Sequence, residues 1–222
     1  MPAIEVEIWS DVACPWCYIG KRKFEAGLAV FAAETGAAPV EVVYRSYELM
    51  PELAVDFDGD ATDLLVRNKG IDPAQVEAMH EQVTAIAAEV GLAYDFSSQQ
   101  PANTRKAHQL IHLGKAHGKQ AEIKERMLAA HFVEGRHIGR DHELANLAVE
   151  VGIDRDEVLT ALADQTYQPA VEADIARARE LGISGVPFFV LDDRYGISGA
   201  QPADTFTQAL RQVATERQGA GQ

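Results

Sequence analysis

The chain has 222 residues, of which 47% are hydrophobic and 24% charged, and its formal net charge is −14. This length allows a sizeable core, in one large domain or two smaller ones. The acidity argues against a nucleic-acid partner and against docking on an anionic membrane, since both need clustered Lys and Arg. No window approaches the ~20 apolar residues of a membrane helix. The N-terminus has neither a basic region nor a long apolar stretch, so we expect a cytoplasmic protein.

The first 46 residues predict a strand, a helix and a second strand. Apolar and polar residues alternate over Ile4–Ser10, which is typical of a strand. Apolar residues then recur at helical spacing from Pro15 to Thr35, and Gly36 supplies a stop signal. Val40–Arg45 is rich in β-branched residues and predicts a second strand, parallel to the first.

A helical block follows, from about residue 61 to residue 181. Asp141 and Asp154 are suited to be helix N-caps, and the block of about 120 residues is large enough for a subdomain. Helical periodicity predicts helices over Pro73–Val90, Thr104–His117, Gln120–Phe132, His142–Val151, Asp156–Leu162 and Gln168–Leu181.

The last part of the chain returns to strands. Val186–Leu191 and Arg194–Ser198 predict a β-hairpin, Pro202–Arg217 predicts a helix, and Gln218–Gln222 is expected to fray. The two outer pieces are too short for separate domains. We therefore predict one α/β domain, residues 1–60 and 182–222, interrupted by a helical insertion domain, residues 61–181.

Cys14 and Cys17 are the only cysteines, in the tetrapeptide Cys14-Pro15-Trp16-Cys17. A disulfide between them closes so short a ring that it stabilises the fold little, which indicates reversible redox chemistry. At a helix start, the unpaired N–H groups and the helix dipole favour a Cys14 thiolate. Cys17 lies one turn on, within disulfide reach. Cys14 is thus the expected exposed nucleophile and Cys17 the more buried resolving thiol.

The alternative for this motif is half of a zinc site. His108 and His112, one helical turn apart, would supply the other two ligands. A zinc site usually takes its Cys-x-x-Cys from a knuckle turn rather than from the start of a long helix, so the strand–helix context favours redox chemistry and no metal. The histidines, with His117, are more simply core or surface residues.

Pro187 stands near the start of the apolar run Val186–Leu191, directly after Val186. A proline is tolerated there only where the sheet does not need its N–H. Taken alone, the segment favours a trans proline opening an edge strand. With Cys-Pro-Trp-Cys upstream, a cis Val186–Pro187 bond becomes the better interpretation.

Strand, Cys-x-x-Cys, helix, strand, helical insertion, Gly-Val-Pro strand, hairpin and helix together resemble the thioredoxin-like fold of DsbA-type oxidoreductases. More narrowly, the chain is similar to the FrnE branch, related to 2-hydroxychromene-2-carboxylate isomerase and kappa-class glutathione transferase. The resemblance implies an α/β thioredoxin-like fold with a large all-helical insertion. The segments that carry it are residues 8–20, 45–49, 103–108, 185–189 and 197–201.

The resemblance also implies roles for individual residues. Cys14 would attack and Cys17 resolve, supported by Pro15 and Trp16. Val186, before a cis Pro187, would pair its backbone with a bound peptide or with glutathione. The isomerase and transferase relatives carry a serine where this chain has Cys14, so dithiol exchange is favoured here. The residues that match a glutathione-facing groove are Asn103, Ser198, Gly199 and Gln201.

The function expected from the sequence is a cytoplasmic protein disulfide oxidoreductase or isomerase of the DsbA family. Its cofactor is the redox-active cysteine pair itself, its substrates are thiols and disulfides of proteins or small molecules, and glutathione is a candidate co-substrate. One alternative is a glutathione-dependent isomerase or transferase of an aromatic or polyketide-like molecule. Another is a redox-sensing or zinc-binding interaction protein. The sequence also allows a homodimer.

Overall fold

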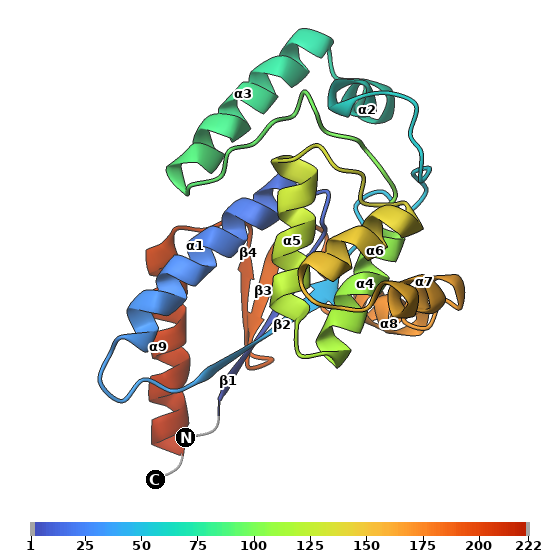
Figure 1. Cartoon of the computed structure of the whole chain (residues 1–222). Helices are drawn as coiled ribbons and strands as arrows, with labels where there is room; N and C mark the ends of the chain where they lie inside the picture. Colours follow the sequence, from blue (N-terminus) through green and yellow to red (C-terminus); the bar gives the residue numbers. More distant parts are fainter. Residues whose placement is uncertain (1–2, 221–222) are drawn as a thin grey trace.

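The structure, a computed structural model, describes residues 3–220 (Figure 1). Its centre is a four-stranded sheet in the order β2 (Val40–Ser46), β1 (Ile4–Ser10), β3 (Phe188–Leu191) and β4 (Tyr195–Ser198). β1 and β2 are parallel, whereas β3 runs antiparallel to β1 and β4 antiparallel to β3. The mixed α/β fold and the parallel first pair are as predicted.

Helices surround this sheet. Helix α1 (Pro15–Ala32) follows β1, and helix α9 (Ala203–Ala220) follows β4. Between β2 and β3 lie α2 (Ala61–Lys69), α3 (Pro73–Glu89), α4 (Arg105–Ala116), α5 (Gln120–Phe132), α6 (Asp141–Glu150), α7 (Arg155–Ala163) and α8 (Gln168–Glu180). The division into two domains at residues 60 and 182 stays a prediction.

The alternation of β1 places side chains on both faces of the sheet. Ile8 pairs with Phe189 of β3, whose ring lies 5.5 Å from that of Phe24 on α1 and 4.6 Å from that of Phe206 on α9. Trp9, the next residue, points to the other face, where it packs with Ala178 of α8. Both faces are therefore covered by helices, and Trp9 is a core residue.

The edge strand β2 is closed by a side chain of the insertion. Gln120, the first residue of α5, accepts a hydrogen bond from the Tyr44 N–H at 3.0 Å and donates one to the Tyr44 carbonyl at 2.9 Å. This amide satisfies the backbone groups that another strand would otherwise pair. The insertion is thus joined to the sheet through backbone hydrogen bonds of β2.

Two helix ends differ from the sequence prediction. Asp154 caps α7, accepting from the N–H groups of Asp156 and Glu157, as predicted. Asp141 is instead the first residue of α6, after the N-cap Arg140. Helix α9 runs on to Ala220, past its predicted end at Arg217, and fraying of the tail stays a prediction; the last two residues lie outside the described ones.

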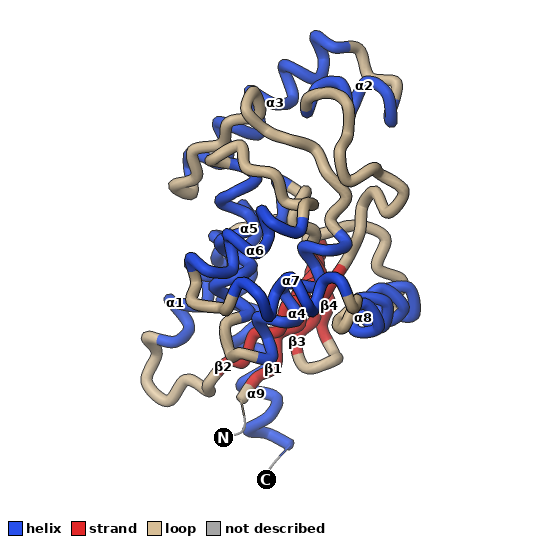
Figure 2. Tube along the Cα trace, turned by 45° about the vertical axis from the view of Figure 1, so that its right-hand side comes forward, coloured by secondary structure: helices blue, strands red, loops and turns tan. Residues whose placement is uncertain are grey.

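Helix α2 was missing from the predicted elements, although its signals are in the sequence. Asp60 and Asp63 form a capping box at its start, and Gly70 ends it with φ of 66°. Figure 2 shows α2 and α3 above the rest of the molecule, connected to it by long loops. Among the described residues, no helix is long and apolar enough to cross a membrane.

Candidate active site

The turn between β1 and α1 holds both thiols. Cys14 is the N-cap of α1, Pro15 occupies the first turn, and the Cys14 carbonyl accepts from the Cys17 N–H at 3.0 Å. No acidic side chain stands in the first helical turn, so nothing there opposes the positive end of the dipole. Both cysteines are free thiols in this structure.

The expected contrast in exposure between the two cysteines is absent. Cys14 is 4% exposed and Cys17 is 3% exposed, so the nucleophile predicted to be exposed is nearly as buried as its partner. Trp16, between them, is 39% exposed. The loop before Pro187 contacts the Cys14 sulfur and contributes to its burial.

The loop before Pro187 lies against the Cys-Pro-Trp-Cys motif. The Val186–Pro187 peptide bond is cis, and the Cys14 thiol donates to the Val186 carbonyl at an Sγ–O distance of 3.5 Å. Helix α1 approaches the loop closely, since a Cβ at Gly20 would lie 2.8 Å from Cγ of Pro187. Strand β3 begins at Phe188, two residues later than the predicted Val186–Leu191, so Pro187 precedes the strand.

Ser198, Gly199 and Gln201 lie beside the same loop. The Gly199 N–H donates to the Pro187 carbonyl at 2.8 Å, and the Gln201 side chain donates to the Ser198 carbonyl at 2.8 Å. Gly199 has φ of 80°, which favours glycine at this turn. The structure thus places these three predicted groove residues next to Pro187.

Asn103 has a different environment. Its amide donates to the carbonyls of Pro51 and Leu53, at 2.9 and 3.0 Å, and its Oδ1 accepts from the Arg105 N–H at 2.9 Å. These contacts hold the loop after β2 against the start of α4. Its glutathione-facing role stays a prediction, while its structural role is plain.

The pKa of Cys14 shifts in the direction opposite to the one expected for a cysteine at a helix start. The hydrogen bond with Cys17, followed by burial, raises the pKa of the Cys14 thiol well above its ordinary value. Burial also acts to raise the pKa of Cys17, but the hydrogen bond from Cys14, the buried Lys124 and Ser10 together lower it. Lys124 was not among the predicted site residues. The signal in the sequence is a lysine within the apolar stripe of its helix, between Ile123 and Met127.

Asp11 precedes the motif and is also buried. Its Oδ1 lies 3.3 Å from His108 Nε2, and its Oδ2 accepts from the Leu49 N–H at 2.8 Å. Burial raises its pKa, but these contacts outweigh burial and the pKa of Asp11 is lowered. Its negative charge raises the pKa of Cys14, the direction expected for an acid beside the motif.

The histidines of the zinc alternative have other partners. His108 contacts Asp11, and His112 Nε2 lies 3.0 Å from Oδ2 of Asp174 on α8. Within residues 3–220, no group of three or more His, Cys, Asp or Glu side chains has a geometry that could hold a metal ion.

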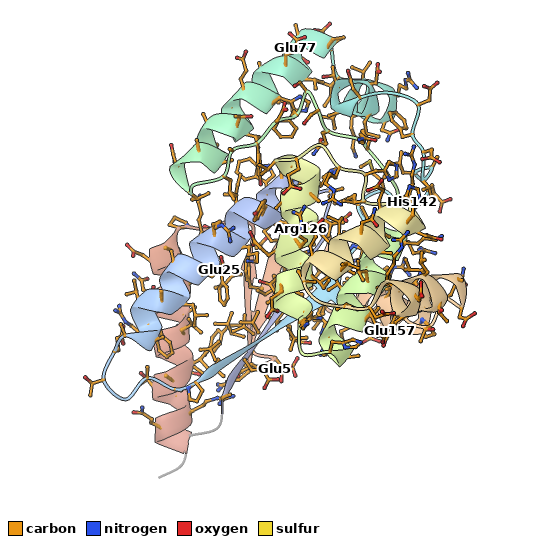
Figure 3. The ribbon with its side chains drawn as sticks, in the orientation of Figure 1. Glu5, Glu25, Glu77, Arg126, His142 and Glu157 are labelled. Carbon is orange, nitrogen blue, oxygen red and sulfur yellow. The ribbon has the colours of Figure 1, made fainter. Side chains whose placement is uncertain are left out.

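Two basic residues that follow the motif, Lys21 and Arg22, pair with acidic side chains. Lys21 contacts Glu125 of α5 at 2.6 Å, and Arg22 contacts the same carboxylate at 3.0 Å. Glu25, labelled on α1 in Figure 3, pairs with both cations. These ion pairs hold the active-site helix against the insertion.

A cavity of about 280 Å³ opens beside the motif, between α1 and the α2–α3 pair. Tyr94, which the sequence analysis missed, supports this side by donating to the Pro15 carbonyl at 2.7 Å. The lining is almost entirely apolar, with Lys69, His80 and Gln99 as polar members. The other lining residues are Ala13, Pro15, Trp16, Leu49, Met50, Ala61, Leu64, Leu65, Met79, Val83, Phe96 and Phe132.

Comparison with known proteins identifies this arrangement. The profile of the DSBA-like thioredoxin domain matches residues 5–211. The chain belongs to this family. The structure of a probable DsbA oxidoreductase, SCO1869 from Streptomyces coelicolor, is 43% identical, with a TM-score of 0.89 over 96% of this chain and 91% of that one. Uncharacterized protein YwbO of Bacillus subtilis (strain 168) is 28% identical over 93% of this chain and 96% of its own length.

Two more distant structures share the fold of this DsbA-like protein. The first is a 2-hydroxychromene-2-carboxylate isomerase, 15% identical, with a TM-score of 0.67 and 98% of both chains covered. The second is the cytosolic disulfide reductase DsbM from Pseudomonas aeruginosa with GSH, 19% identical, with a TM-score of 0.63 over 95% of this chain and 99% of that one. The predicted DsbA-type thioredoxin-like fold, with the isomerase among its structural neighbours, is confirmed.

Proposed function

We propose that this chain is a thiol–disulfide oxidoreductase that exchanges disulfides with its substrates through Cys14 and Cys17. The observation that carries the proposal is the position of the Cys14 sulfur, 3.5 Å from the Val186 carbonyl before cis Pro187, in a turn whose residues Pro15 and Trp16 line the apolar cavity. We expect a substrate to reach this thiol beside the Val186 backbone and to place a side chain in the cavity. The family match and the DsbA-like neighbours support the reaction class.

In the reducing direction, the Cys14 thiolate attacks one sulfur of a substrate disulfide. A Cys14–substrate S–S bond forms, the substrate bond breaks, and the other substrate sulfur leaves as a thiolate that takes up a proton. The Cys17 thiolate then attacks Cys14 Sγ, which releases the second substrate thiol and leaves the Cys14–Cys17 disulfide. The reverse sequence oxidises a substrate dithiol and returns both cysteines to thiols.

The groups around Cys14 suit a substrate with apolar surface beside its cysteine. Val186 presents its backbone at the position where an extended segment would pair, while the cavity walls are side chains such as Trp16, Leu64 and Met79. Burial of one apolar side chain there contributes about 1.5–3 kcal/mol. We therefore propose a peptide or protein substrate with an apolar side chain next to the reacting cysteine.

The function is tested by assaying the purified protein for insulin-disulfide reduction with dithiothreitol and for oxidative refolding of a reduced protein. The matched control is the same preparation with both thiols alkylated. The native protein should accelerate at least one reaction, and the alkylated protein neither. Equal rates for the two preparations in both assays would contradict the proposed activity.

The reduction potential then gives the direction of electron flow. Titration against glutathione buffers should give one two-electron transition for the Cys14–Cys17 pair. A value near about −270 mV corresponds to a thioredoxin-like reductant and one near about −120 mV to a DsbA-like oxidant. We propose glutathione as a co-substrate and a cytoplasmic location, supported by the cytosolic DsbM structure with GSH.

The cavity is tested by Met79→Asp, since Met79 lines it and is 44% exposed. A carboxylate in the apolar wall should raise KM about tenfold for a peptide disulfide with an aromatic neighbour. The KM for glutathione disulfide should be unchanged. Val30→Asp is the control, because Val30 is an exposed residue of α1 that does not line the cavity. Equal KM values for Met79→Asp and Val30→Asp with the aromatic peptide would exclude this binding site.

A further inference from the structure

Gln99, in the loop that leads from α3 to α4, has a buried side-chain amide without a partner. The residue is 9% exposed, and within residues 3–220 its Nε2 makes no hydrogen bond. An unpaired donor of this kind loses its hydration on folding and gains no bond in return. Native proteins seldom leave such a group unpaired, so the Gln99 amide indicates a partner that comes from outside the chain.

The Gln99 side chain lines two cavities. The first is the apolar cavity beside the Cys-Pro-Trp-Cys motif. The second, of about 350 Å³, is polar, and its cations already face a carboxylate, since Arg140 and His137 lie 2.6 and 3.4 Å from Oδ1 of Asp56. Because the motif itself lines the first cavity, a group bound there lies beside the reacting turn. The first cavity is thus the one in which a substrate can supply the partner of Gln99.

His80 of α3 is a second polar side chain that lines the apolar cavity without a partner. Its ring lies flat against that of Phe96, with the centroids 4.2 Å apart and an interplanar angle of 5°. Within residues 3–220 the imidazole makes no hydrogen bond or ion pair. Burial lowers the pKa of His80, so the ring is neutral at pH 7 and presents one donor and one acceptor nitrogen. Together with Gln99, it gives the apolar wall two unpaired polar groups.

The rest of the wall decides which chemical class of ligand fits. Of the described residues that line the cavity, none is acidic, and the one charged side chain, Lys69, is exposed. A purely apolar group would leave the Gln99 amide unpaired, and a carboxylate would lose its hydration without a buried cation beside it. A neutral hydroxyl on an aromatic ring avoids both costs.

The size of the cavity fits one side chain. Its volume of about 280 Å³ lies just below the range of about 300–1,000 Å³ that is usual for drug-sized ligands. The rings of Trp16, Phe96 and Phe132 belong to its wall, and aromatic side chains pack well against one another. A single aromatic ring is therefore the expected occupant.

We propose that the cavity binds a tyrosine side chain next to the reacting cysteine of the substrate, with the phenol hydroxyl hydrogen-bonded to the Gln99 amide. This rests on the proposed function, because disulfide exchange at Cys14 is what brings a peptide to the cavity. A hydroxyl both donates and accepts, so it pairs with the amide through either Nε2 or Oε1. Gln99 is then a specificity-determining residue that distinguishes tyrosine from phenylalanine.

The site is tested first without thiol chemistry, by the binding of p-cresol and toluene, which correspond to the side chains of tyrosine and phenylalanine. Titration followed by nuclear magnetic resonance gives both dissociation constants. In Gln99→Met, which keeps the length of the side chain, the affinity of p-cresol relative to toluene should fall about tenfold. Gln100→Met is the matched control, because Gln100 lines the second cavity only and its amide donates to the Gly135 carbonyl at 2.7 Å.

The stability of Gln99→Met shows whether the amide is unpaired in the free protein. Replacing an unpaired buried amide by an apolar side chain of similar shape should leave the Tm unchanged or raise it. Thermal unfolding measures the change and shows that the variant is folded. A clear loss of Tm would mean that the amide has a partner within the protein, and would overturn the proposal.

Two peptide disulfides that differ only in a tyrosine or a phenylalanine after the cysteine then test the site in the reaction. The native protein and Gln100→Met should prefer the tyrosine peptide in kcat/KM, and Gln99→Met should lose about tenfold of this preference. An equal preference in the native protein and Gln99→Met would overturn the proposal, as would tighter binding of the carboxylate p-toluate than of p-cresol. If p-cresol binding depended on Gln99 but no disulfide were exchanged, the proposed function would fail and the phenol site would stand.

Discussion

Cys14→Ser is expected to abolish disulfide exchange, and Cys17→Ser is expected to trap the protein on its substrate. Without Cys14, no sulfur stands at the Val186 edge, so turnover should fall to the uncatalysed rate. Without Cys17, the first step still occurs but the mixed disulfide on Cys14 has no internal thiol to resolve it. Non-reducing gels and intact-mass measurement after incubation with an oxidised peptide report both outcomes.

The asymmetry between the two variants is the informative result. The mass of Cys17→Ser should increase by that of one half of the peptide disulfide, and dithiothreitol should reverse the increase. Cys14→Ser should show no lasting adduct, because the Val186 carbonyl, beside which we expect the substrate to pair, contacts Cys14. If Cys14→Ser retained native turnover, or formed the adduct instead of Cys17→Ser, the assigned order of attack would be wrong.

Asp174→Ala is expected to cause the largest loss of stability among single polar substitutions. Asp174 of α8 accepts from the Ser46 N–H at 2.9 Å and contacts His112 and Arg45 at 3.0 and 3.1 Å. Removal of this carboxylate leaves buried groups of β2 and α4 without their acceptor, at a cost of about 3–5 kcal/mol. A chain of this size loses about 2–4 °C in Tm for each kcal/mol. Urea and thermal unfolding measure the change.

The loss of stability caused by Asp174→Ala should depend on pH, in the direction set by the ionisation of the Asp174 carboxylate. Burial opposes the charge, but the contacts with His112, Ser46 and Arg45 outweigh it and lower the pKa of Asp174. The stabilisation is then present above the unfolded pKa of about 3.9 and is lost as pH falls through the lower folded pKa. The native and Asp174→Ala proteins should therefore converge in stability in acid.

A matched control for Asp174 lies on the same helix. Glu180 of α8 pairs with Arg177 at 3.3 Å, and its side chain is 67% exposed. Glu180→Ala should change Tm little at any pH, since exposed pairs contribute little. If Asp174→Ala were as mild as Glu180→Ala, the contacts between α8 and β2 would not be what anchors the insertion.

Much of the fold could be predicted because its signals are local. The alternation in Ile4–Ser10, the β-branched run from Val40 and the helical periodicity of Gln120–Phe132 each lie within a short window. Helix α2 was overlooked because it has only 9 residues and its marks are the capping box and Gly70 rather than a long apolar stripe. The use of Gln120 to close the edge of β2 had no local signal, because its partner lies 76 residues away.

Some features of the candidate site could likewise be predicted from local sequence, and others could not. The sequence by itself determined the two thiols at a helix start and a proline before the third strand, because a motif and a resemblance carry them. The tertiary structure decided their environment: both thiols are buried, Cys14 contacts the Val186 carbonyl, and the buried Lys124 of α5 acts to lower the pKa of Cys17. Burial and charge come from segments far apart in the chain. For that reason the acidity of the pair, unlike its identity, could not be predicted from the spacing of Cys14 and Cys17.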